Sequence, residues 1–127
     1  KAYAQMNASG WLRPASMGGG KNSYSAVAGG YISEALKQVS GVATTWNYLN
    51  SESALVNAVT AGKLVGLGSK VSPSIASVVG SHAYAVVGYD AATGQFTLFN
   101  PWGIHYGTLR LTWSQLVAGF SEWDSTV

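Results

Sequence analysis

Residues 81–103 have the sequence SHAYAVVGYDAATGQFTLFNPWG, and this stretch decides the fold. Its two halves are rich in β-branched and aromatic residues, and the segment 91–94 between them contains a glycine suited to a turn. The pattern predicts two antiparallel strands, 81–90 and 95–103, joined by a short hairpin loop. In such a hairpin the start of the first strand lies beside the end of the second. We therefore expect His82 and Asn100 to be neighbours in space.

A histidine beside an asparagine is half of the Cys-His-Asn arrangement that papain-like proteases use. When one ring nitrogen donates a hydrogen bond to an amide oxygen, the tautomer and orientation of the ring are fixed, and the other nitrogen is free to activate a nucleophile. On this interpretation His82 is the catalytic base, Asn100 orients it, and Trp102 covers their hydrogen bond and excludes water. The alternative is a core histidine and an ordinary turn asparagine before a proline.

Two blocks of this stretch resemble the calpain family of cysteine proteases, which belongs to the papain superfamily. SHAYAV (81–86) is similar to the family's Gly-His-Ala-Tyr-Ser-Val block, and NPWG (100–103) is similar to its asparagine block. A third similarity lies upstream, where KAYAQMN (1–7) is followed by Ser-Tyr at 23–24 and Gly-Gly at 29–30, as in the calpain segment after the cysteine-bearing subdomain. The resemblance implies that residues 1–127 are the C-terminal, His/Asn-bearing part of a calpain-like catalytic domain.

The resemblance also implies site residues. His82 and Asn100 are the expected catalytic residues, and Trp102 is expected to support them. Gly29 and Gly30 are candidate substrate-binding residues, because a Gly-Gly at the corresponding place in calpains lies near the substrate cleft. Ser81, which directly precedes His82, is a further candidate substrate-binding residue. The local alternative for the two glycines is a tight turn with positive φ angles.

The chain contains no cysteine, so the nucleophile implied by the resemblance is absent. In the papain arrangement the histidine follows the cysteine by about 130–150 residues, whereas 81 residues precede His82. We expect the cysteine on an upstream segment or a companion chain, and no protease activity from these residues alone. The missing cysteine also motivates an alternative, a non-catalytic calpain-like domain that acts as a binding or regulatory module. A carbohydrate-binding β-module is ranked last, because it does not account for the helix expected at Ser51.

Composition narrows the expected partners. Charged residues make up 9% of the chain and the net charge is +2, which does not favour nucleic-acid binding. No apolar run reaches membrane-spanning length. The expected partners are therefore a protein or peptide substrate and the cysteine-bearing segment, not nucleic acid or a membrane. We expect no cofactor and no metal site. In calpains a long insertion after the asparagine block carries calcium ligands, and here only a few residues follow, which puts calcium dependence in doubt.

The other segments predict an α+β fold, an antiparallel sheet curled toward a papain-like β-barrel with flanking helices. Helices are expected at 1–7, at 31–39 with Ile32, Ala35, Leu36 and Val39 on one face, and at 51–61 with Ser51 as N-cap. A further helix is expected from a Thr112–Gln115 capping box through about Val117, ending at Gly119. Extended segments are expected at 43–49, 63–68, 109–111 and 120–127, the last with Phe120 and Trp123 inward. Residues 69–80 are interpreted as a flexible loop bordering the cleft, with solvated serines.

Overall fold

The computed structural model describes residues 2–10, 12–13 and 15–127, and the chain divides into two compact units. The first unit ends at Tyr31 and the second spans Ile32–Val127. The first unit contains helix α1 (Ala2–Ala8) and two 3-10 turns, Ala15–Met17 and Ser25–Val27. The helix predicted at 1–7 is confirmed over its described residues, and Lys1 lies outside them.

Hydrogen bonds from two polar side chains to the backbone hold the first unit together. The amide nitrogen of Asn7, a fully buried residue, donates to the carbonyl oxygens of Gly18 at 2.8 Å and Lys21 at 3.0 Å. The Arg13 guanidinium donates to the carbonyl oxygens of Ala26 at 3.2 Å and Val27 at 3.1 Å. These bonds satisfy backbone acceptors in a segment that has little regular secondary structure.

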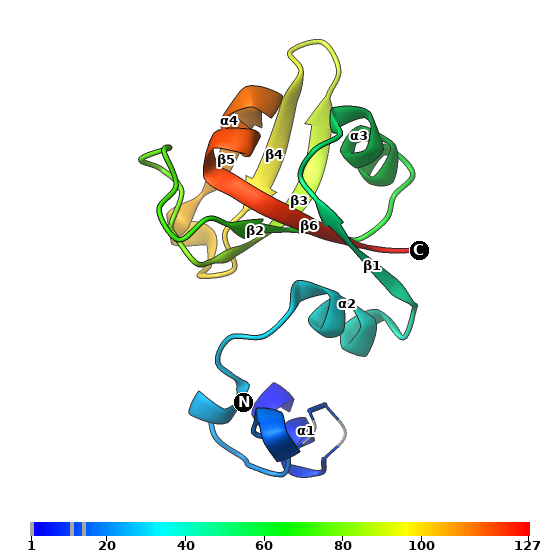
Figure 1. The fold of residues 1–127 in the computed structure, drawn as a ribbon, viewed down its shortest axis with the longest axis vertical. Helices are drawn as coiled ribbons and strands as arrows, with labels where there is room; N and C mark the ends of the chain where they lie inside the picture. The colour runs from blue at the N-terminus through cyan, green and yellow to red at the C-terminus, as the bar shows by residue number, and fades with distance from the viewer. Residues whose placement is uncertain (1, 11, 14) are drawn as a thin grey trace. The chain divides into compact units, whose positions relative to one another are not determined.

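The second unit is α+β, as predicted. Among the described residues six strands form one antiparallel sheet in the order β1-β6-β2-β3-β4-β5 (Figure 1). The strands are β1 (Thr44–Tyr48), β2 (Val65–Ser69), β3 (Ala83–Asp90), β4 (Gln95–Phe99), β5 (Thr108–Thr112) and β6 (Phe120–Thr126). The helices are α2 (Ile32–Ser40), α3 (Glu52–Thr60) and α4 (Trp113–Gly119). Because β1 pairs with β6 and β5 pairs with β4, and not with each other, the sheet is open and the expected curl does not close a barrel.

The core lies on one face of the sheet. Residues alternate between buried and more exposed along β3 and β4, which is the period of a sheet with one covered face. Helix α3 contacts β3, helix α4 contacts β5 and β6, and their buried side chains join a single apolar cluster. The cluster includes Leu55, Leu67, Tyr84, Phe96, Leu98, Leu116, Phe120 and Trp123. The inward orientation predicted for Phe120 and Trp123 is therefore confirmed.

Both predicted helix caps are confirmed. Ser51 Oγ accepts the Ala54 N–H at 3.3 Å at the start of α3. The Gln115 side chain accepts the Thr112 N–H at 2.9 Å at the start of α4. Each cap satisfies a backbone donor that the helix itself leaves without a partner.

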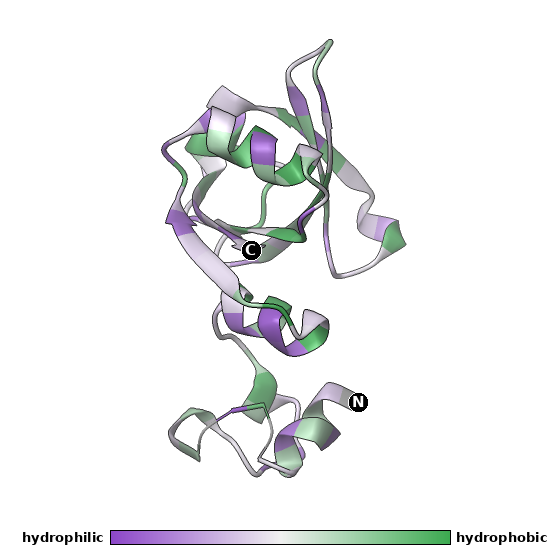
Figure 2. Cartoon of the chain, turned by 90° about the vertical axis from the view of Figure 1, so that its right-hand side faces the viewer, coloured by the Kyte–Doolittle hydropathy of each residue, from purple (hydrophilic) through white to green (hydrophobic). Residues whose placement is uncertain are grey.

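Helix α2 packs against β2 on the face of the sheet that lies opposite the apolar core. A Cβ built on Gly66 would overlap the Ile32 side chain, so the glycine allows the helix to approach the strand closely. Figure 2 shows hydrophilic and hydrophobic residues alternating along this helix. The predicted apolar face is nevertheless wrong in part, because Ile32 is half-buried whereas Ala35 and Val39 are exposed. The helix is short and touches the sheet near its N-terminus, which leaves its C-terminal turns uncovered.

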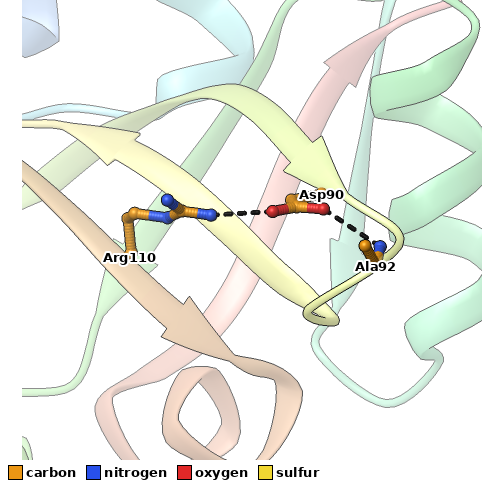
Figure 3. Close-up of polar contacts among 3 residues, drawn as sticks. All are labelled: Asp90, Ala92 and Arg110. Carbon is orange, nitrogen blue, oxygen red and sulfur yellow. Dashed lines mark hydrogen bonds and ion pairs between the residues drawn. The ribbon is translucent and has the colours of Figure 1, made fainter.

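The predicted hairpin is confirmed, with β3 and β4 antiparallel and a four-residue loop at 91–94. Asp90 accepts the Ala92 N–H at 3.0 Å and forms an ion pair with Arg110 at 2.9 Å, which ties the hairpin to β5 (Figure 3). The two strands are shorter than predicted at the end of the hairpin away from its loop, because β3 begins at Ala83 and β4 ends at Phe99. Ser81 has a φ of +50°, which is incompatible with an extended strand, and the chain turns after Phe99 so that the Gly103 N–H donates to the Asn100 carbonyl at 3.1 Å.

Candidate active site

The hairpin brings the predicted pair together. His82 immediately precedes β3 and Asn100 immediately follows β4, and Ala85 faces Phe99 across the two strands. The distance from His82 Nε2 to Asn100 Oδ1 is 2.9 Å. The proximity predicted from the hairpin is thus confirmed.

A second hydrogen bond determines the tautomer of His82. The backbone N–H of Trp102 donates to the same Asn100 Oδ1 at 3.0 Å. A backbone N–H can only donate, so the shared atom is the amide oxygen and its partner Nε2 must carry the proton. In the neutral ring Nδ1 then holds the free lone pair, and among the described residues no group donates to it.

Two aromatic rings contact the imidazole. The centroid of the Trp102 ring lies 4.5 Å from that of His82 at an interplanar angle of 44°, and the Tyr84 ring meets His82 edge-on at 5.1 Å. Tyr84 is buried, whereas Trp102 is 55% exposed and also contacts Tyr106 at 5.3 Å. Trp102 therefore lies against the His82–Asn100 pair, as predicted, but it leaves the pair partly open to solvent. Because Asn100 is only 5% exposed, its side of the hydrogen bond is dry.

The backbone around His82 is held by a residue that the sequence did not single out. Ser69 was interpreted as a solvated loop serine, and this interpretation is wrong. It is the last residue of β2 and is half-buried, and its hydroxyl accepts the His82 N–H at 2.8 Å. The Ser69 N–H in turn donates to the His82 carbonyl at 2.9 Å. No motif marks this serine, and its contact with His82 depends on the pairing of β2 with β3.

The other candidate residues fall in two places. Ser81 is exposed and directly precedes His82, and its N–H donates to the Lys70 carbonyl at 3.0 Å. Gly29 and Gly30 belong to the first unit and have φ angles of +66° and +119°. The positive φ angles expected from the local alternative are therefore present, in a bend of the chain. Substrate binding by Ser81, Gly29 and Gly30 stays a prediction.

In the part of the chain that the structure describes, no group of three or more His, Asp or Glu side chains is arranged to hold a metal ion. His105 lies exposed in the 3-10 turn Ile104–Tyr106.

Within the described residues, no helix has the length and apolar character needed to cross a membrane.

No protein-family model matches the chain, and no curated protein matches it. The calpain-like relationship is therefore a hypothesis supported by the sequence blocks quoted above and by the geometry of the pair.

Proposed function

We propose that this chain is the His/Asn-bearing part of a calpain-like, papain-superfamily cysteine endopeptidase. On this proposal its open antiparallel sheet is the barrel-side half of a papain-like fold. The chain supplies the base and the orienting amide for peptide-bond hydrolysis, and it is inactive until a cysteine is supplied by another segment or chain.

The chemistry follows from the protonation of His82. With the proton on Nε2 and the lone pair on Nδ1, the ring accepts the proton of a thiol placed next to Nδ1, and a thiolate–imidazolium pair forms. The thiolate attacks the substrate carbonyl carbon. Nδ1–H then protonates the leaving amine, and a water molecule later releases the acyl group with His82 again acting as base.

The orienting residues act before the chemical steps. Asn100 keeps the imidazole in the tautomer that exposes a base, and it remains an acceptor when the ring becomes positively charged. Trp102 lowers the local dielectric on one side of this hydrogen bond, which strengthens the bond. Pro101 and Gly103 shape the turn and take no part in the chemistry.

One observation carries the proposal: the 2.9 Å contact between His82 Nε2 and Asn100 Oδ1, with the same oxygen bound to the Trp102 N–H. An asparagine that only shaped the turn would not need a side-chain hydrogen bond to His82, whereas this bond fixes the tautomer of the half-buried ring. The absence of cysteine from the 127 residues favours the second candidate, a non-catalytic calpain-like domain that acts as a binding or regulatory module.

The test expresses the chain together with the residues that its gene encodes upstream of Lys1 and measures cleavage of a fluorogenic peptide. We expect activity, a loss of about 10³-fold or more in kcat/KM for His82→Ala, and a smaller loss for Asn100→Ala because the base survives. His105→Ala is the matched control, since this histidine is exposed in a separate turn, and it should leave activity unchanged.

The same experiment separates the two candidates. Full activity in His82→Ala would refute the protease assignment. A gene that places Ser or Ala where a Gly-x-Cys-Trp-like run is expected, together with an inactive product that still binds peptides, would establish the binding module.

A further inference from the structure

Ser69 bonds both backbone polar groups of His82. Its hydroxyl accepts the His82 N–H at 2.8 Å, and its own N–H donates to the His82 carbonyl at 2.9 Å. The hydroxyl proton points to the Val79 carbonyl at 2.7 Å, with the His82 carbonyl as a more distant acceptor at 3.0 Å. A single residue therefore bonds the peptide units on both sides of the histidine, and its hydroxyl also bonds the end of the preceding loop.

The turn that these bonds hold is a strained one. Ser81 has a φ of +50°, in the left-handed region that non-glycine residues rarely occupy. Such a conformation persists when the surrounding structure over-determines it. Here the Val79 N–H donates to the Tyr84 hydroxyl at 2.9 Å, and the Ser81 N–H donates to the Lys70 carbonyl at 3.0 Å. Together with Ser69, these contacts fix residues 79–82 at both ends.

We propose that Ser69 is a positioning residue for His82, and that its hydroxyl holds the His82 backbone where the imidazole can reach Asn100. This inference rests on the proposed function, in which His82 is the base. A histidine side chain has two rotatable bonds, so the direction of Nδ1 follows once the backbone is fixed and Nε2 is bonded to Asn100. Without the hydroxyl the His82 N–H and the Val79 carbonyl lose their partner, and the strained turn is free to relax.

The first test is histidine NMR on the 127-residue chain, which needs no cysteine. In the wild type we expect a Nε2-protonated imidazole for His82 with a slowly exchanging Nε2–H. In Ser69→Ala we expect this signal to be lost to exchange and the tautomer to become mixed. Ser69→Thr keeps the hydroxyl and should keep the signal. Ser121→Ala is the matched control, because its hydroxyl reaches the same strand at the Gly68 carbonyl, at 3.5 Å, and does not bond His82.

The second test measures kinetics in the protein that includes its cysteine-bearing segment. A displacement of a catalytic group by about 1 Å costs up to about 10²-fold in rate. We therefore expect Ser69→Ala to lower kcat by about 10- to 100-fold with KM unchanged, and Ser69→Thr to restore kcat. A residue needed only for stability would lower the unfolding midpoint without this separation of kcat from KM.

The outcomes separate this inference from the proposed function. If Ser69→Ala keeps both the protected Nε2–H and the wild-type kcat, the positioning role is refuted while the function stands. If His82→Ala remains active, the function is refuted, and the NMR result still decides whether Ser69 holds the ring. Should Ser69→Ala fail to fold, Ser69→Cys takes its place in the NMR test, because sulfur is a weak hydrogen-bond acceptor and the same loss of signal is expected.

Discussion

Asp124 is a buried carboxylate whose ionisation should make the stability of the sheet depend on pH. It is 1% exposed in β6, and its Oδ2 accepts the Ser33 N–H of helix α2 at 3.1 Å. Within the described residues its Oδ1 has no hydrogen-bond partner. Burial, and secondly the negative charge of Glu122, raise the pKa of Asp124 from 3.8 to about 6, although the Ser33 N–H opposes this shift.

The sign and size of the effect follow from this shift. A carboxyl with a raised pKa binds its proton more tightly in the folded chain, so protonation favours folding. The contribution of Asp124 is therefore fully present below about pH 4 and is lost as the pH rises through about 6. Because each pH unit between the folded and unfolded pKa is worth about 1.36 kcal/mol, the loss amounts to at most about 3 kcal/mol.

The assay is urea denaturation of the wild type and Asp124→Asn from pH 4 to pH 8. Asparagine cannot ionise, so the free energy of unfolding of the wild type should fall relative to the variant by up to about 3 kcal/mol across this range. Asp90→Asn is the control, and its difference from the wild type should stay nearly constant across this range. The Thr93 side chain, followed by the Ala92 N–H, lowers the pKa of Asp90 from 3.8, so the contribution of this carboxylate is lost only at more acidic pH than the assay covers. A difference between wild type and Asp124→Asn that stays constant with pH would refute the reasoning.

Two further substitutions test the packing. Gly66→Ala places a Cβ against Ile32 and should lower the free energy of unfolding by about 1–3 kcal/mol. Gly88→Ala, in a strand position with open space, is the control and should change this free energy by less than about 0.5 kcal/mol. Equal effects of the two substitutions in urea denaturation would contradict the close approach of α2. Ser51→Ala removes the acceptor of the Ala54 N–H and should cost about 1 kcal/mol in thermal unfolding, so an unchanged midpoint would show that this cap does not stabilise α3.

Local signals in the sequence were sufficient for much of the fold. The hairpin was predictable because apolar, β-branched and aromatic residues flank a short loop containing Gly94, and the caps at Ser51 and Thr112 mark helices that the structure contains. The closure of the sheet was not predictable from such signals. It depends on whether β1 and β5 meet, and no pattern within either strand encodes a pairing between residues so far apart in the chain.

In the candidate site too, the contact set by the local hairpin was predictable and the contact set by long-range strand pairing was not. The proximity of His82 and Asn100 follows from the hairpin, since a local turn fixes which residues face each other. Ser69 could not be found in this way. Its role arises where β2 pairs with β3, and its sequence context, a serine after Gly-Leu-Gly and before a loop, is typical of a solvated residue.

Three adjacent strands thus contribute to the geometry of one imidazole. Its backbone is bonded to the end of β2, its own strand is β3, and its ring is bonded to the residue that follows β4. Groups at the ends of paired strands are placed more precisely than groups on loops, because the pairing of the strands fixes their positions relative to one another. The thiol that completes the proposed site therefore meets a base whose tautomer and direction are already set. When the cysteine-bearing segment binds this chain, less of the binding free energy is then needed to order the histidine, and more is left to hold the thiol in place.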